Sequence, residues 1–148
     1  MWRIVGSLFF GNKDYFCITE EKRFNKDLLV DFLTEKGIAL SDTAQAVTRL
    51  KGTAADADLR IDQPMDIPSF LRQLPLCNTI ATTGGKAGDE LAAMFGVETP
   101  KVGECTTFNF EGRTITFYRM PSSSRAYPLA LDKKAAAYKV LFGAVGLL

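Results

Sequence analysis

Short β-branched segments alternate along the chain with amphipathic segments that stop at glycine, and this alternation limits the fold most strongly. Residues 77–83 are typical of a strand, and residues 84–96 are typical of a helix that opens on two glycines and closes on a third. Residues 104–110 and 113–119 predict two strands of a hairpin across a turn at Glu111 and Gly112. This order predicts an α/β protein, a three-layer sandwich whose mostly parallel central sheet is covered by helices on both faces.

Five further segments carry start, stop or burial signals. They predict a helix from residue 2 that stops before Gly11, a helix after Asn25 that stops at Gly37, a buried strand over 38–40, a short helix over 67–75, and a last helix with Leu131, Ala135, Tyr138 and Phe142 on one face. Residues 43–59 are polar and alanine-rich, and they fit either a helix or a structured loop.

Length and composition are those of an ordinary globular domain. With 148 residues, of which 47% are apolar and 24% charged, the chain is predicted to form one domain over residues 1–148. No apolar run reaches the roughly 18 residues of a membrane span, and the apolar opening lacks a signal-peptide cleavage pattern. Cys17, Cys77 and Cys105 form no C-x-x-C motif, so neither a disulfide framework nor a zinc site is expected, and a cytoplasmic location fits.

The chain contains no histidine, which narrows the chemistry that it can perform. Ser-His-Asp and Cys-His nucleophile systems, histidine-ligated metals and imidazole acid–base catalysis are all excluded. No metal and no other cofactor is predicted. Any catalysis has to use carboxylates, amides, lysine, tyrosine, hydroxyls or backbone N–H groups.

Charge is unevenly distributed, although the whole chain carries only +1. Residues 113–139 have a local net charge of +5, which leaves −4 on the other residues; the charged groups of this run are Arg113, Arg119, Arg125, Lys133, Lys134 and Lys139 against Asp132. The run indicates a side of the molecule that faces anions. A solvated helix face is the other explanation.

Three loops follow predicted strands, at the edge of an α/β sheet where ligands usually bind. Asp42 follows the first strand, the Gly84-Gly85-Lys86 turn follows the second, and residues 121–125 follow the last. We therefore expect Asp42, Gly84, Lys86, Ser122 and Arg125 to border one cleft.

Each of these loops also has a purely structural interpretation. The glycine pair and Lys86 open a helix, where free N–H groups favour an anion, but a tight strand-to-helix turn has the same letters. Residues 121–125, PSSSR, offer hydroxyls and a guanidinium for phosphates, or a serine turn that caps the last helix. Asp42 is a candidate functional carboxylate or the acceptor of an Asx-turn.

Together, three segments resemble the uracil-DNA glycosylase superfamily, and they are most like its hypoxanthine (deoxyinosine) DNA glycosylase branch. The matching residues, in the family's order, are Ile38-Ala39-Leu40 with Asp42, Lys51-Gly52-Thr53 with Asp56, Thr82 to Ala87, Met120 to Ser124, and Lys133 to Tyr138. The resemblance runs from Trp2 to about Phe142.

The resemblance implies a single uracil-DNA glycosylase-like domain that recognises a flipped, deaminated base, hypoxanthine or uracil, in double-stranded DNA. It implies a base pocket or rim at Asp42, Thr83, Gly84 and Gly85. It also implies DNA contacts from the residues of two loops, Lys86, Pro121, Ser122, Ser123, Ser124 and Arg125. In the family the second of these loops enters the minor groove.

The chain departs from the family at its start and at Arg125, where the family usually has proline. Met1 and Trp2 occupy the place of an aromatic-Trp pair that follows a first strand and a water-positioning loop in relatives. Either the gene starts further upstream, or the chain lacks the catalytic motif; no catalytic residue is therefore assigned. The alternatives are a non-catalytic nucleic-acid or nucleotide-binding relative, and a domain whose rim has no ligand.

Overall fold

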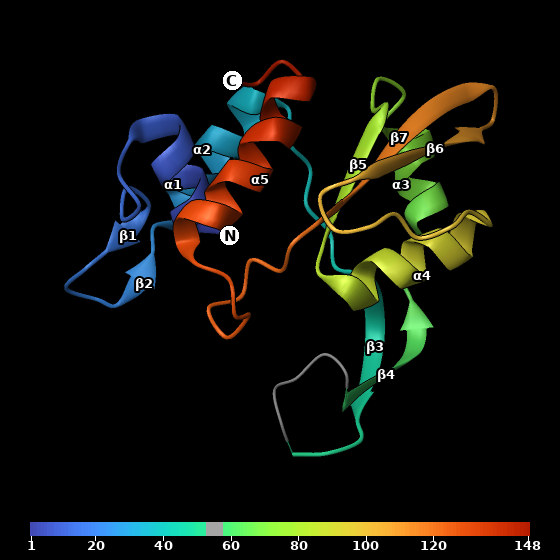
Figure 1. Ribbon diagram of the computed structural model, residues 1–148, viewed down its shortest axis with the longest axis horizontal. Helices are drawn as coiled ribbons and strands as arrows, with labels where there is room; N and C mark the ends of the chain where they lie inside the picture. Colours follow the sequence, from blue (N-terminus) through green and yellow to red (C-terminus); the bar gives the residue numbers. More distant parts are fainter. Residues whose placement is uncertain (53–57) are drawn as a thin grey trace. The chain divides into compact units, whose positions relative to one another are not determined.

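The structure is a computed structural model that describes residues 1–52 and 58–148 (Figure 1). Its chain divides into two compact units. Residues 1–40 and 122–148 form the first, here called the helical unit, and residues 41–121 form the second, here called the sheet unit. Among the described residues no helix is long and apolar enough to cross a membrane.

The helical unit contains three helices whose ends follow the signals in the sequence. They are α1 (Trp2–Phe10), α2 (Lys26–Lys36) and α5 (Leu131–Ala144), with a small antiparallel ribbon of β1 (Cys17–Ile18) and β2 (Arg23–Phe24) between the first two. The Asn25 side chain accepts a hydrogen bond from the Leu28 N–H at 3.1 Å and caps α2. Gly11 and Gly37 end α1 and α2 in the left-handed conformation. The three predicted helices are confirmed.

Aromatic side chains dominate the core of the helical unit. Its buried hydrophobic residues are Ile4, Val5, Phe16, Leu29, Phe32, Tyr138, Leu141 and Phe142. The Phe9 ring makes edge contacts with Phe32 and Phe142, at centroid distances of 5.0 and 5.1 Å, and so links all three helices. Burial also raises the pKa of the Tyr138 hydroxyl above its ordinary value.

The sheet unit is built on a three-stranded sheet in the order β5-β7-β6. These strands are β5 (Thr79–Thr83), β6 (Cys105–Phe110) and β7 (Arg113–Met120). β5 and β7 run parallel, whereas β6 and β7 form the predicted antiparallel hairpin, with Phe110 opposite Arg113. Glu111 and Gly112 both have positive φ, as a tight two-residue hairpin turn requires.

Two helices cover one face of this sheet. They are α3 (Ile67–Gln73) and α4 (Gly85–Phe95), which begin at the predicted positions. Asp66 caps α3 by accepting a hydrogen bond from the Ser69 N–H at 3.0 Å. The shared core consists of Leu71, Leu91, Ala92, Phe108, Phe110, Ile115 and Phe117.

The predicted three-layer sandwich with a mostly parallel central sheet is wrong. The described strands form three separate sheets of two, two and three strands, and β5–β7 is the parallel pair among them. The alternation in β6 and β7 gives the physical reason. Thr107, Asn109 and Thr114 are exposed, each next to a buried apolar residue, so the outer face of the sheet is polar. A sheet covered on both faces needs apolar residues on both.

The predicted buried strand over 38–40 is also absent, which removes a neighbour from the expected sheet. These residues are irregular, and the Leu40 side chain is 58% exposed. The undecided segment after them instead forms β3 (Ala44–Arg49), which pairs antiparallel with β4 (Leu59–Pro64) in an exposed ribbon (Figure 1). Thr53 and Asp56, which carried part of the resemblance, lie outside the described residues.

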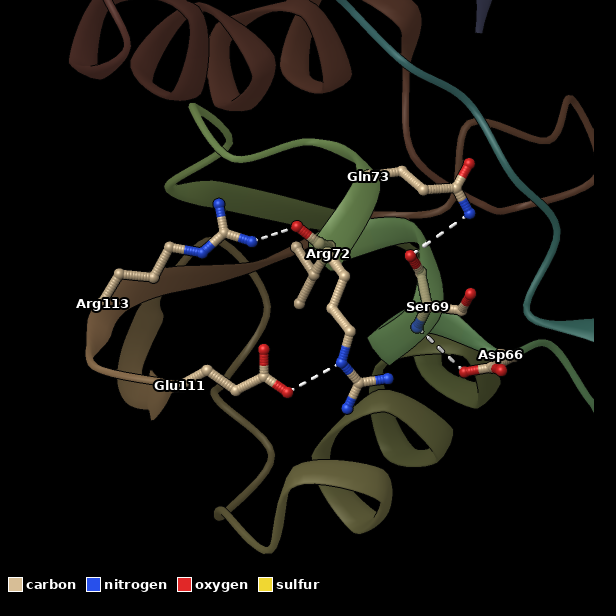
Figure 2. A network of polar contacts seen from close by, with 7 residues as sticks. Asp66, Ser69, Arg72, Gln73, Glu111 and Arg113 are labelled. Carbon is tan, nitrogen blue, oxygen red and sulfur yellow. Dashed lines mark hydrogen bonds and ion pairs between the residues drawn. The ribbon is translucent and has the colours of Figure 1, made fainter.

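A single arginine joins the sheet to the end of α3. The Arg113 guanidinium donates hydrogen bonds to four carbonyl oxygens, those of Leu71, Leu74 at 2.7 Å, Pro75 at 2.8 Å and Cys77 at 2.9 Å. Figure 2 shows this side chain reaching α3 from the hairpin, beside the ion pair of Arg72 with Glu111 at 2.8 Å. The Leu71 and Leu74 carbonyls also accept from backbone N–H groups, so Arg113 adds a charged donor to the end of α3 and to the segment that follows it.

Candidate functional site

The turn between β5 and α4 is the most distinctive local structure among the predicted site residues. Gly84 has a φ of 102°, which a residue with a side chain rarely adopts. Its N–H donates to the Met120 carbonyl at 3.1 Å, and Thr83 lies opposite Met120 in the parallel pair. The chain therefore leaves β5 at Gly84 and β7 at Pro121 from the same end of two neighbouring strands.

The first turn of α4 presents backbone donors without a competing acceptor. Gly84 is the N-cap residue and supplies no side-chain cap, and no acidic residue lies in the first turn. The first N–H groups of a helix have no partner within it, and they lie at the positive end of its dipole. Lys86 adds a positive charge to the same turn. This end of α4 is suited to an anion.

Arg119 lies directly against this turn. A Cβ atom on Gly85 would stand 3.1 Å from the Arg119 Nη2 atom, and one on Gly88 would stand 3.3 Å from its Cδ atom. The two glycines thus let the side chain of Arg119 run close against the start of α4. The opposite end of the guanidinium donates from Nη1 to the Pro100 carbonyl at 3.2 Å.

The charge of Arg119 is not neutralised by the residues that the structure describes. Its Nε atom is buried and has no hydrogen-bond partner there, and none of the ion pairs in that part of the chain involves it. A guanidinium without a carboxylate, set beside free helix N–H groups and Lys86, can bind a phosphate or carboxylate oxygen. This arrangement is the candidate site.

Sequence reasoning did not select Arg119 as a site residue, although a signal was present. Along β7, Ile115, Phe117 and Arg119 occupy alternate positions, and the first two are buried in the core. Residues two apart on a strand share a face. A charged residue that follows buried apolar residues on the same face of a strand is therefore a candidate site residue.

Asp42 is exposed, and it follows an irregular segment rather than a strand. Its carbonyl oxygen accepts a hydrogen bond from the Ser41 hydroxyl at 2.9 Å. Asp42 therefore does not lie beyond the carboxyl end of a strand, as the sequence had predicted. Its place in a base pocket stays a prediction that rests on the resemblance.

Residues 122–127, here called the serine loop, belong to the helical unit. The Ser124 N–H donates to the Ser122 hydroxyl at 3.3 Å, and the Ala126 N–H donates to the Ser124 hydroxyl at 3.2 Å. Ser123 lies between them, and Arg125 is exposed. Gly84 and Pro121 belong to the sheet unit.

The basic run over 113–139 contains both hydrogen-bonded and exposed cations, and it is divided between the two units. Arg113, Arg119 and Lys134 each donate hydrogen bonds to backbone carbonyl oxygens. The exposed cations of the run are Arg125, Lys133 and Lys139. About half of the local charge therefore has a structural partner.

Comparison of the chain with protein-family models, with curated proteins and with solved structures finds no match. Within residues 1–52 and 58–148, no group of three or more Cys, Asp or Glu side chains could hold a metal ion.

Proposed function

We propose that the chain binds DNA through its phosphate groups at the turn between β5 and α4, as a non-catalytic nucleic-acid-binding protein. The observation that carries the proposal is the Arg119 guanidinium, held against the first turn of α4 without a carboxylate partner among the described residues. Lys86 and the free N–H groups of the same turn add to the positive potential.

A phosphate group of DNA fits this site better than a carboxylate or a free nucleotide does. Phosphate has several oxygens, so it can accept from a guanidinium and from helix N–H groups at once. The sequence around the site, Thr82 to Ala87, resembles a motif of DNA glycosylases, which supports DNA over a free nucleotide. Phosphate contacts position a protein on DNA without reading its sequence.

Recognition of a flipped hypoxanthine or uracil is the more specific form of this proposal. It rests on the resemblance alone, and it adds Asp42, Thr83 and the serine loop to the contacts with DNA. Under this form the protein works on DNA in the cytoplasm. A preference for duplexes that contain inosine or uracil over matched normal duplexes supports it, and equal affinity for both counts against it.

The binding proposal is tested by fluorescence anisotropy with a labelled duplex over a range of salt concentrations. Each phosphate contact that is lost lowers the slope of log K against log salt by about 0.9. Lys86→Met and Arg119→Met should each lower the affinity and flatten the slope. The matched control is Arg72→Met, because Arg72 is already paired with Glu111. Equal slopes in all four proteins overturn the proposal.

The serine loop supplies an independent test on the other unit. If Arg125 contacts phosphates, Arg125→Ala should weaken binding by the same factor for duplexes of different sequence and flatten the salt slope. An unchanged slope means that Arg125 does not touch the DNA backbone. That result leaves the site at α4 unaffected, because the two loops belong to different units.

A further inference from the structure

Lys134 is a buried cation that lacks a carboxylate partner in the part of the chain that the structure describes. Only 4% of the residue is exposed. The ion pairs formed by the described residues involve other side chains. Removing an ammonium group from water is costly unless hydrogen bonds replace those to water. The partners of Lys134 should therefore matter to the structure.

These partners are carbonyl oxygens of the serine loop. The Lys134 Nζ atom donates to the Ser124 carbonyl at 2.6 Å and to the Tyr127 carbonyl at 3.2 Å. It also lies 5.5 Å from the centroid of the Tyr127 ring, within the range of a cation–π contact. One side chain on α5 thus holds the loop at two backbone positions.

The hydrogen bonds made by the loop's own N–H groups shape it but do not attach it to α5. The donors are the N–H groups of Ser124, Ala126 and Tyr127, and their acceptors are Ser122 and Ser124. Each of these bonds closes a turn within residues 122–127. A loop that is fixed mainly through its own turns can swing as a body unless another element holds it.

We infer that Lys134 is the positioning residue of the serine loop: its buried ammonium ties the Ser124 and Tyr127 carbonyls to α5 and fixes the direction in which Ser122, Ser123 and Arg125 are presented. Lys134 acts through the loop backbone and does not itself contact a ligand. Replacing it with an apolar side chain removes the charged donor from both carbonyls, which then keep only the N–H groups of Tyr127 and Leu129, and this releases the loop from α5.

The test uses trypsin under native conditions, because the exposed Arg125 lies inside the loop and the bond after it reports loop opening. Lys134→Met should speed cleavage after Arg125 by about tenfold or more, since hydrogen bonds to charged groups are among the strongest and cleavage tracks the open population. Lys133→Met is the matched control, because it removes the same charge from the neighbouring, exposed position. Its rate after Arg125 should stay within about twofold of the natural chain.

Cleavage after Lys22 provides an internal reference, because Lys22 is an exposed residue of the same unit with no part in the loop. General unfolding by Lys134→Met would raise cleavage at both bonds alike, and a changed ratio shows local release. Lys134→Arg, which keeps a cation, should give a ratio nearer to that of the natural chain than Lys134→Met does. Equal ratios for Lys134→Met and Lys133→Met overturn the inference.

A measurement of duplex binding by the same variants connects this inference to the proposed function. Only this measurement rests on the proposed function. Lys134→Met should weaken duplex binding more than Lys133→Met, although both remove one charge. If no variant binds DNA while the cleavage ratio changes as expected, the proposed function fails and the role of Lys134 stands. If the natural chain binds DNA and both variants behave alike in cleavage and in affinity, the role of Lys134 fails instead.

Discussion

Some basic side chains in this protein stabilise the fold and others remain able to bind a ligand, and the sequence does not distinguish the two groups. Arg113 donates hydrogen bonds to four carbonyl oxygens, and Lys134 donates to two. Both side chains therefore connect one segment of the fold to another. Arg119 has one such bond and a buried Nε atom without a partner among the described residues. A charge that is fully engaged stabilises the fold, whereas one that is partly engaged retains the capacity to bind a ligand.

At the residue scale, Arg113→Met should lower the free energy of unfolding by about 2–4 kcal/mol, because it removes the charged donor that four carbonyls share at the end of α3 and after it. The measurement is urea denaturation followed by circular dichroism. Arg72→Met is the comparison, since the Arg72–Glu111 pair is exposed and should contribute less than about 1 kcal/mol. Similar losses in the two variants would contradict the assigned role of Arg113.

At the scale of the helices, two glycines should respond to alanine in opposite directions. On Gly6 in α1 a Cβ atom would stand 2.5 Å from the Asn12 carbonyl oxygen, which belongs to the turn after the helix. On Gly143 in α5 the same atom would meet nothing within 4 Å. Comparing alanine at these two positions therefore separates the effect of packing on stability from the effect of intrinsic helix propensity.

Gly6→Ala should therefore destabilise the protein by about 2 kcal/mol or more, because backbone atoms have to move. Gly143→Ala should stabilise it by up to about 1 kcal/mol, because alanine loses less conformational freedom in a helix. Thermal unfolding of the two variants beside the natural chain gives both values. A stabilising Gly6→Ala would show that the turn at Asn12 does not pack against α1.

The ribbon of β3 and β4 should respond to acid through one carboxylate. The Thr48 hydroxyl and the Arg60 guanidinium both donate to Asp62, and these hydrogen bonds, with Thr48 first, hold the pKa of Asp62 below 3.8. Because the folded pKa is lowered, the stabilisation is complete above pH 3.8 and is lost as the pH falls through the folded value.

Thr48→Val should raise the pKa of Asp62 toward its ordinary value, whereas Thr48→Ser, which keeps the hydroxyl, should leave it low. The measurement is an NMR titration of the side-chain carboxyl carbon. A pKa of Asp62 that is the same in the valine and serine variants would rule out the Thr48 hydrogen bond as the main cause.

At the scale of the whole molecule, we expect the 148-residue chain to release neither hypoxanthine nor uracil from DNA at an appreciable rate. It has no histidine, and Asp42, the carboxylate predicted at the rim, is exposed. A misplacement of about 1 Å in a catalytic group can lower the rate on the order of a hundredfold. The assay is alkaline strand cleavage at inosine or uracil in a duplex. Rapid base release that Asp42→Asn abolishes would contradict this expectation.

The candidate site was predicted in part. The sequence identified Gly84, Gly85 and Lys86, because a glycine pair between a β-branched strand and an apolar helix has a local signature. It did not identify Arg119, because that residue reaches the turn only through the parallel pairing of β5 with β7. Such pairing joins residues far apart in the chain, so no local pattern reports it.

The sequence by itself determined the local elements. Asn25, Gly11 and Gly37 set the ends of helices, and the Glu111-Gly112 turn set the hairpin, because caps and turns depend on residues a few positions apart. Tertiary structure decided which strands became neighbours. The apolar residues 38–40 predicted a buried strand, but they pair with no strand that the structure describes. Residues 44–49 instead pair with residues 59–64. Strand pairing is settled by which faces can be covered, a property of the assembled chain that local letters do not carry.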